Sequence, residues 1–258
     1  MAIHAEIFLI PFLFVLSAPA AGETVHEAAD AAFVLRVGCD SYEPYNYWDE
    51  TGSCVGISAD LAREACSRMG CRPEFVFLDW SRKDELLESG RIDCIWGAFT
   101  MTGAETRYRW AGPYGHSRQV LLVPATSSVK SLSDLKGRRV AVQTTGFAER
   151  FLEARSNASG WFRSLYSFPK MGNVMAALRQ GYVDAVAGHE EVLWQYLPRE
   201  EHQRYKVVPT PLATGRLGVA FSLKDDRGWD KRLDVALREM LQDGTVSRIM
   251  HQYHVKHP

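Results

Sequence analysis

This 258-residue sequence lacks several features, and each absence excludes a class of function. Beyond residue 22 no apolar run is long enough to span a bilayer, so we expect a soluble mature protein. Neither Cys-x-x-Cys nor His-x-His occurs, which argues against a zinc site. The formal net charge of −1 gives no indication of nucleic-acid binding. No repeat of solenoid period is evident, so one large or two small globular domains are expected.

The first 22 residues differ in composition from the rest of the chain. An apolar run from residue 7 to residue 16 is interrupted only by Pro11, and small residues follow from Ser17 to Gly22. This pattern is typical of a secretory signal peptide, although no Lys or Arg precedes the apolar run. We therefore expect residues 1–22 to be a signal peptide and residues 23–32 a linker. The mature protein would then be periplasmic and lack about its first 20 residues.

The five cysteines are an odd number, so an exported chain would keep at least one unpaired thiol. Cys66 and Cys71 flank the end of an expected helix and could pair with each other. Cys39 and Cys94 fall in expected strands, where buried reduced thiols are ordinary.

Strands and helices alternate along the first half of the sequence, which predicts a parallel α/β unit. Ser58 is a plausible N-cap and Gly70 a C-cap for one of these helices. The expected elements are a strand at 33–38, a helix at 58–69, a strand at 73–78, a helix at 84–88 and a strand from Cys94.

A second α/β set follows an apolar run at 120–123. Thr145 to Phe147 stand where one of its helices begins, and Thr245 caps the last helix of the chain. The expected elements are strands at 138–142, 165–168, 183–187 and 217–222, and helices at 147–154, 172–180, 229–242 and 245–254.

The segment from Asp93 to Tyr114 is the centre of this arrangement. A short buried strand at Cys94 ends in the hydroxyl-rich stretch Thr100-Met101-Thr102-Gly103. In open α/β sheets, ligands bind at the carboxyl ends of the strands, so these hydroxyls are candidate ligand contacts. The alternative is an ordinary strand followed by a surface loop.

In order and spacing, several segments resemble the extracellular solute-binding proteins of the polar amino acid type, which have the type II periplasmic binding fold. The resemblance covers about residues 33 to 256 and rests on LRVGCDSYEPYNY, VGISADLAREACSRMG, FLDWSRKDELLESGRIDCIWG, WAGPY, VLLV, SLSDLKGRRVAVQTTG, ALRQGYVDAVAG and LQDGTVSRIMHQY. It implies an α/β protein of two lobes, each a doubly wound sheet, joined by a hinge of two crossings. Lobe one would comprise 33–117 and 216–258, and lobe two 118–215. The crossings would lie near Ser117 to Gln119 and Leu212 to Arg216.

The resemblance also implies a ligand site between the lobes, at strand ends. Aromatic faces suit an aliphatic stem, a ring or a cation, and a helix start suits an anion. No catalytic residue, metal or cofactor is expected. The candidate ligand-binding residues are Asp40, Tyr45, Trp80, Gly97, Thr100, Thr102, Arg107, Gln143, Thr145, Gly146, Phe147, His189 and Glu190.

Two departures from the family pattern concern the usual amino-acid clamp. Ala104 stands where relatives carry an Arg that forks onto the ligand carboxylate, and Arg107 is the nearest substitute. His189 stands where relatives carry an Asp for the ligand ammonium, with Glu190 next to it; a structural alternative for this pair is a helix N-terminus. We therefore expect weak or no binding of standard polar amino acids, unless Arg107 or the amides of Thr145 to Phe147 take the carboxylate.

Three functions compete at this point. The first is a non-catalytic, monomeric binding protein that delivers a small polar solute, an amino acid or a related compound, to an ABC-type membrane permease. The second is the ligand-sensing lobe of a signalling system. The third is an exported enzyme resembling cyclohexadienyl dehydratase, with His189 and Glu190 as acid and base. The sequence contains no nucleophile–base motif, metal-ligand set or phosphate-binding loop, so we expect no enzyme.

Overall fold

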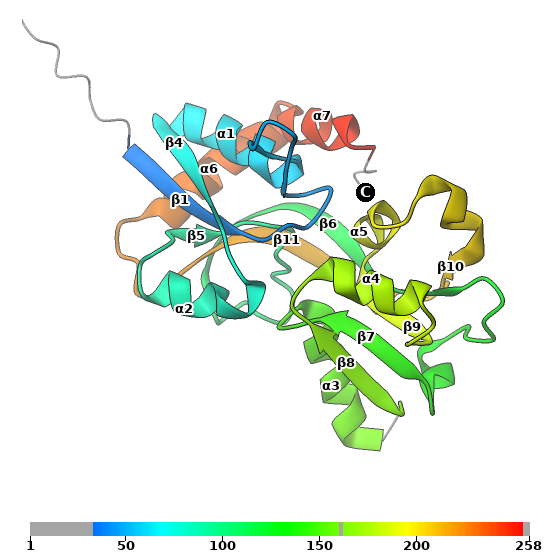
Figure 1. Ribbon diagram of the computed structural model, residues 1–258. Helices are drawn as coiled ribbons and strands as arrows, with labels where there is room; N and C mark the ends of the chain where they lie inside the picture. Colours follow the sequence, from blue (N-terminus) through cyan, green and yellow to red (C-terminus); the bar gives the residue numbers. More distant parts are fainter. Residues whose placement is uncertain (1–32, 160–161, 255–258) are drawn as a thin grey trace, which may run out of the picture. The chain divides into compact units, whose positions relative to one another are not determined.

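A sheet of nine strands runs through the part of the chain that this computed structural model describes, residues 33–159 and 162–254 (Figure 1). The strand order is β4-β1-β5-β11-β6-β9-β7-β8, and β10 pairs with β6. The strands are β1 (Phe33–Cys39), β4 (Cys71–Phe77), β5 (Cys94–Ile95), β6 (Arg109–Pro124), β7 (Arg139–Gln143), β8 (Ser164–Phe168), β9 (Ala185–His189), β10 (Tyr205–Val207) and β11 (Ala213–Phe221). The signal peptide and linker expected at residues 1–32 lie outside the described residues.

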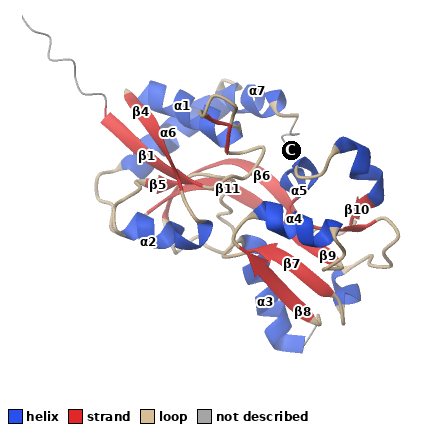
Figure 2. Ribbon diagram, viewed as in Figure 1, coloured by secondary structure: helices blue, strands red, loops and turns tan. Residues whose placement is uncertain are grey.

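The sheet has two parallel parts with antiparallel strands between them. β1 pairs in parallel with β4 and β5, and β7 pairs in parallel with β8 and β9. We call β4, β1 and β5 the first half of the sheet, and β9, β7 and β8 the second half. The long strands β6 and β11 are antiparallel to each other and run between the halves (Figure 2). The predicted α/β architecture is therefore confirmed.

Helices cover both halves of the sheet. In the first half, α1 packs on β4 and on α6, while α2 contacts β1 and β5 from the other side (Figure 1). In the second half, α3 packs on β7 and β9, and α4 on β7, β8 and β9. The helices are α1 (Ile57–Met69), α2 (Lys83–Glu88), α3 (Phe147–Ser159), α4 (Met171–Arg179), α5 (Glu190–Gln195), α6 (Trp229–Gln242) and α7 (Thr245–Gln252).

Short elements complete the described structure. A two-stranded ribbon follows β1, and 3₁₀ turns precede α2, β7 and β10. They are β2 (Tyr47–Trp48), β3 (Cys54–Val55), η1 (Trp80–Arg82), η2 (Leu132–Leu135) and η3 (Arg199–Arg204). Within the described residues, no helix combines the length and apolarity that crossing a membrane requires.

Two expected helix caps are wrong. α1 starts after Gly56 and α7 after Gly244, so Ser58 and Thr245 lie inside the helices instead of capping them. The reason at α1 is a close approach of the backbone. A Cβ on Gly56 would lie 2.4 Å from the carbonyl oxygen of Tyr45, and its φ of 117° also favours glycine. Neither constraint is visible as a local capping pattern.

The largest difference from the sequence prediction is β6. The sequence showed only an apolar run at 120–123, but one 16-residue strand spans Arg109–Pro124. It is held by antiparallel partners β11, β9 and β10, which are distant in sequence. The expected crossing residues lie within these paired strands, with Ser117 opposite Gly215 and Gln119 opposite Ala213.

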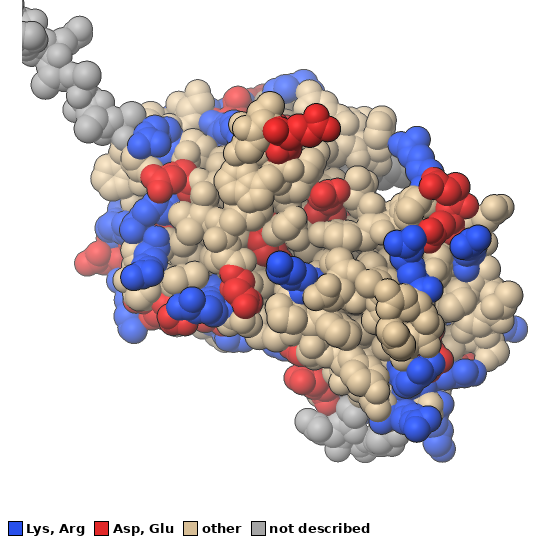
Figure 3. All heavy atoms as spheres, viewed as in Figure 1, with Lys and Arg blue, Asp and Glu red and all other residues tan. Residues whose placement is uncertain are grey.

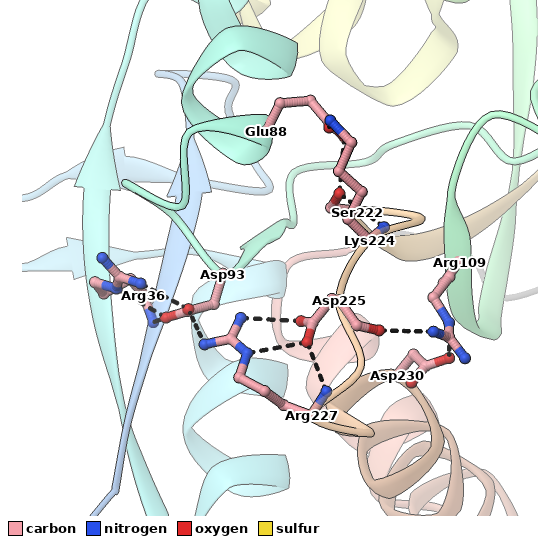
Figure 4. Close-up of polar contacts among 9 residues, drawn as sticks. All are labelled: Arg36, Glu88, Asp93, Arg109, Ser222, Lys224, Asp225, Arg227 and Asp230. Atoms are coloured by element: carbon pink, nitrogen blue, oxygen red, sulfur yellow. Dashed lines mark hydrogen bonds and ion pairs between the residues drawn. The ribbon is translucent and has the colours of Figure 1, made fainter.

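Charges in the first half are tightly paired around one buried carboxylate. Asp93, whose side chain is 2% exposed, accepts hydrogen bonds from Arg36 and Arg227 (Figure 4). Burial alone would raise the pKa of Asp93, but the bonds from Arg36 and Arg227 hold it below its ordinary value. Arg227 also binds Asp225, so β1, β5 and the loop before α6 are tied together. All five cysteines are thiols, including Cys66 and Cys71.

Candidate binding cavity

A small cavity lies where strand ends of both halves meet. Its volume is about 30 Å³, room for two or three water molecules. The lining comes from the ends of β1, β5, β7 and β9, from β6, and from the first turn of α3. It consists of Asp40, Tyr42, Trp80, Gly97, Ala98, Phe99, Thr100, Gln119, Gln143, Gly146, Phe147, Ala148, Arg150, Met171, Ala187, Gly188 and His189. This is the sheet edge at which ligands bind in open α/β folds.

Asp40 joins the two halves at one end of the cavity. The Gln143 amide donates to its Oδ2 at 2.7 Å and to the carbonyl of Pro169 at 3.2 Å. Burial raises the pKa of the Asp40 carboxyl to about 6, although the bond from Gln143 opposes that shift. Near neutral pH this cavity therefore holds a carboxylate that is poorly solvated and would gain from a cationic partner.

His189 anchors a chain of hydrogen bonds that leads away from the cavity. Its Nδ1 lies 2.7 Å from Ser117 Oγ, and Ser117 in turn donates to Glu191 Oε1 at 2.6 Å. Tyr45 also donates to Glu191 Oε1 at 2.6 Å. On the other side of the ring, His189 Nε2 lies 2.9 Å from Gln119 Nε2.

The proton count along this chain fixes the tautomer of His189. Ser117 has one hydroxyl hydrogen and gives it to Glu191, so it must accept from Nδ1–H of His189. Burial lowers the pKa of His189, which keeps the imidazole neutral near pH 7. Its Nε2 is therefore an acceptor on the cavity side, filled by the amide of Gln119.

The turn before α3 has a strained backbone and a buried cation. Thr145 has a φ of 57°, and Ala98 across the cavity has a φ of 52°; such values are rare outside glycine and gather at functional sites. The Lys83 ammonium donates to Thr145 Oγ1 at 2.8 Å and lies 5.2 Å from the Trp80 ring centroid. Burial lowers the pKa of Lys83, while Asp84, 3.7 Å away, opposes the shift.

The structure brings most of the sequence-predicted site residues together. Gly97 has no room for a side chain there, because a Cβ would lie 2.8 Å from Asn46 Nδ2. The predicted residues that line the cavity are Asp40, Trp80, Gly97, Thr100, Gln143, Gly146, Phe147 and His189.

The other five predicted residues do not line it. Tyr45 is 1% exposed behind the wall, and Tyr42 takes the cavity position. Thr102 accepts from the amide of Arg216, and Thr145 is engaged by Lys83. Arg107 is half-exposed and lies 3.5 Å from Asp84.

Glu190 lies on the opposite side of β6. It forms an ion pair with Arg118 at 3.0 Å and lines a second cavity of about 880 Å³. Its place at the start of α5 fits the structural alternative, a helix N-terminal carboxylate.

Sequence reasoning missed Tyr42, Gln119, Arg150 and Met171. Arg150 had a usable signal, since it follows Phe147 by three residues and so shares a helix face with it. Gln119 had none, because it meets His189 through the antiparallel pairing of β6 with β9, across 70 residues of sequence. Among the described residues, no group of three His, Cys, Asp or Glu side chains could hold a metal ion.

Charge on the molecular surface is mixed. On the face drawn in Figure 3, basic and acidic side chains are interspersed over most of the area. This distribution agrees with a net charge of −1.

Comparison with known proteins gives a consistent family. The L-cystine-binding protein TcyA of Bacillus subtilis (strain 168) is 26% identical over 221 residues, covering 84% of this chain and 79% of that protein. Among solved structures, an ancestral arginine-binding protein bound to arginine superposes with a TM-score of 0.78 and 28% identity, covering 86% of this chain and 99% of that one. The ancestral amino acid-binding protein AncCDT-1, a precursor of cyclohexadienyl dehydratase, gives a TM-score of 0.74 and 25% identity, with 85% and 94% covered.

These likenesses confirm the type II periplasmic binding fold. The family model for bacterial extracellular solute-binding proteins, family 3, matches residues 35–256, nearly all of the chain that follows the expected linker. The chain therefore belongs to the bacterial extracellular solute-binding proteins of family 3.

Proposed function

We propose that this chain is a periplasmic, non-catalytic protein that captures an amino acid or a related small polar solute and delivers it to an ABC-type permease. The observation that carries this proposal is the cavity itself, which is lined from both halves of the sheet at their strand ends. Family membership and the names of the relatives support a binding role.

Capture requires the halves to move apart. A cavity of about 30 Å³ is too small for an amino acid, and the bonds Gln143–Asp40 and Lys83–Thr145 join the two halves of the sheet. We take residues 33–117 and 216–258 as one lobe and 118–215 as the other. The rotation would take place in the two segments that connect the lobes, near Ser117 to Gln119 and near Leu212 to Arg216.

Thermal-shift measurements with the standard amino acids, L-cystine and simple amines test this function. A solute at a hundredfold its dissociation constant should stabilise the protein by about 2.7 kcal/mol. Solution scattering with that solute should show a smaller radius of gyration than without it. Absence of any stabilisation across the panel, or an unchanged radius at saturation, would contradict the proposal.

A dehydratase-like activity is the second candidate, and one observation favours it. Asp40 has a pKa of about 6 inside a cavity that also holds His189, and such a carboxyl can act as a general acid. The likeness to a dehydratase precursor adds weight. Incubation with prephenate or arogenate separates the two candidates, since a pure binding protein gives no product.

A further inference from the structure

Arg150 is the cationic side chain in the cavity lining, and its charge is poorly compensated. Its Nη1 donates to the backbone carbonyl of Thr145 at 2.9 Å. No carboxylate of the described residues lies within ion-pair distance of its guanidinium. A partly buried cation without an anion is unfavourable, so an anionic group beside it would be stabilising.

The nearby carboxylates are engaged elsewhere. Asp84 accepts from the Tyr108 hydroxyl and pairs with both Arg107 and Lys83. Glu149 accepts from the amide of Thr145 and the hydroxyl of Ser167. Three cationic side chains, Lys83, Arg107 and Arg150, therefore lie near only two carboxylates, Asp84 and Glu149. The oxygens of both carboxylates already have hydrogen-bond or ion-pair partners.

The backbone amides at the start of α3 are only partly available to bind an anion. Glu149 already occupies the amide of Thr145, and the amide of Gly146 donates to Gln143. Two of the groups expected to receive a carboxylate are thus satisfied within the protein. The amide of Phe147 and the side chain of Arg150 remain, and Arg150 is held toward the cavity by its bond to Thr145.

Lys83, from the first half of the sheet, helps to hold Arg150 in place. Its side chain is 2% exposed, and it fixes Thr145, whose carbonyl in turn fixes Arg150. Lys83 is therefore a positioning residue that also adds positive charge beside the site. Trp80 and Phe147 supply apolar walls, which exclude water and strengthen the attraction for an anion.

We propose that Arg150 is the carboxylate-binding residue of this cavity and that it replaces, from the second half of the sheet, the Arg absent at Ala104. This inference rests on the proposed function. Asp40 lines the same cavity, and its carboxylate suits an ammonium group. The solute is then a zwitterionic amino acid whose carboxylate contacts Arg150 and whose ammonium contacts Asp40.

The test compares each amino acid that stabilises the wild type with its own decarboxylated amine, such as L-arginine with agmatine or L-histidine with histamine. By calorimetry, the amino acid should bind and the amine should bind at least tenfold more weakly. Arg150→Gln should weaken amino-acid binding by about 10- to 100-fold, the usual effect of losing a charged hydrogen-bond donor. Arg150→Lys should recover part of that loss, because it restores the charge.

The matched control is Arg107→Gln, which removes a neighbouring cation outside the cavity and should change affinity by less than threefold. The melting temperature of ligand-free Arg150→Gln should equal or exceed that of the wild type, whereas a structural role for Arg150 would lower it. Amino acids that bind independently of Arg150, or amines that bind as tightly, would overturn the inference and leave the binding function standing. If neither set binds, the proposed function fails and the carboxylate site with it.

Discussion

The two regions of concentrated charge in this protein differ in how completely their charges are paired. Around Asp93, the guanidinium groups of Arg36 and Arg227 each lie 2.8 Å from the buried carboxylate. In the cavity, Arg150 donates to the backbone carbonyl of Thr145 and forms no ion pair with a carboxylate of the described residues, and the Asp40 carboxylate accepts from the amide of Gln143 across the halves. The charges of the first region hold the fold together, and under the proposed function those of the second are available to a ligand.

The largest effect should come from breaking the paired region. Asp93→Asn leaves Arg36 and Arg227 without their shared carboxylate. We expect a loss of about 2–3 kcal/mol in the free energy of unfolding, measured in urea. This is less than the 3–5 kcal/mol of a fully buried pair, because both guanidinium groups keep contact with solvent.

The pH dependence of the same variant has a definite sign. The pKa of Asp93 is depressed in the folded protein, so its contribution to stability is present above its ordinary pKa and is lost as the pH falls through the depressed value. The stability gap between wild type and Asp93→Asn should therefore narrow only in acid. The exposed Asp226→Asn is the control and should stay within about 0.5 kcal/mol of wild type. Equal stability of both variants would mean that the pairing around Asp93 contributes nothing.

The second prediction concerns Asp40, whose charge is unpaired in the absence of a cation. Burial raises the pKa of Asp40 to about 6, so folding favours the neutral carboxyl. The contribution of this carboxyl to the free energy of unfolding is full below about pH 4 and is lost as the pH rises through 6. Binding of an ammonium requires the ionised form. Amino-acid affinity should thus fall about tenfold between pH 7.5 and pH 5, following the ionised fraction.

The Asp40→Asn variant separates the titration of Asp40 from that of its neighbours. Burial lowers the pKa of His189, Lys83 and Arg150, so the variant without the Asp40 carboxyl shows what these groups contribute to the pH profile. Asp40→Asn should bind weakly at pH 7.5 and show a flat profile, as measured by calorimetry. A wild-type affinity that does not change from pH 5 to pH 7.5 would place the ammonium elsewhere.

The sequence predicted the fold well where local patterns decide it. The helix at 229–242 has the predicted bounds. Asp40, Gly97 and Gln143, which follow or end predicted parallel strands, all line the cavity. Of β6 only the apolar run at 120–123 was evident from the sequence, because its partners β9, β10 and β11 are remote in sequence and leave no local trace.

The cationic residue of the cavity could not be predicted from local sequence either. The sequence offered Arg107 as the substitute for the Arg absent at Ala104, because it is near in the chain. The structure turns Arg107 to solvent and Asp84, and places Arg150 in the cavity through the packing of α3 on β7 and β9. Which face of a helix meets a cavity depends on that packing, so spacing from Phe147 alone made Arg150 only one of several choices.

The smallest effect should come from the hydrogen-bond chain behind the cavity, in which the Glu191 carboxylate accepts from the hydroxyls of Tyr45 and Ser117. Ser117→Ala removes both the acceptor of His189 Nδ1–H and a donor to Glu191. We expect a loss of about 1–2 kcal/mol in the free energy of unfolding, the usual effect of leaving buried polar groups unsatisfied. The exposed Ser133→Ala should change it by less than about 0.5 kcal/mol.

Nitrogen NMR of the His189 ring gives a sharper readout than stability. The wild type should show a single neutral tautomer with the proton on Nδ1, because Ser117 can only accept there. In Ser117→Ala, the ring loses that acceptor, and the proton should distribute between Nδ1 and Nε2. The Nε2–H form would then face the amide of Gln119 and turn the cavity side of His189 from an acceptor into a donor. An unchanged ring spectrum would show that Ser117 does not set the tautomer of His189.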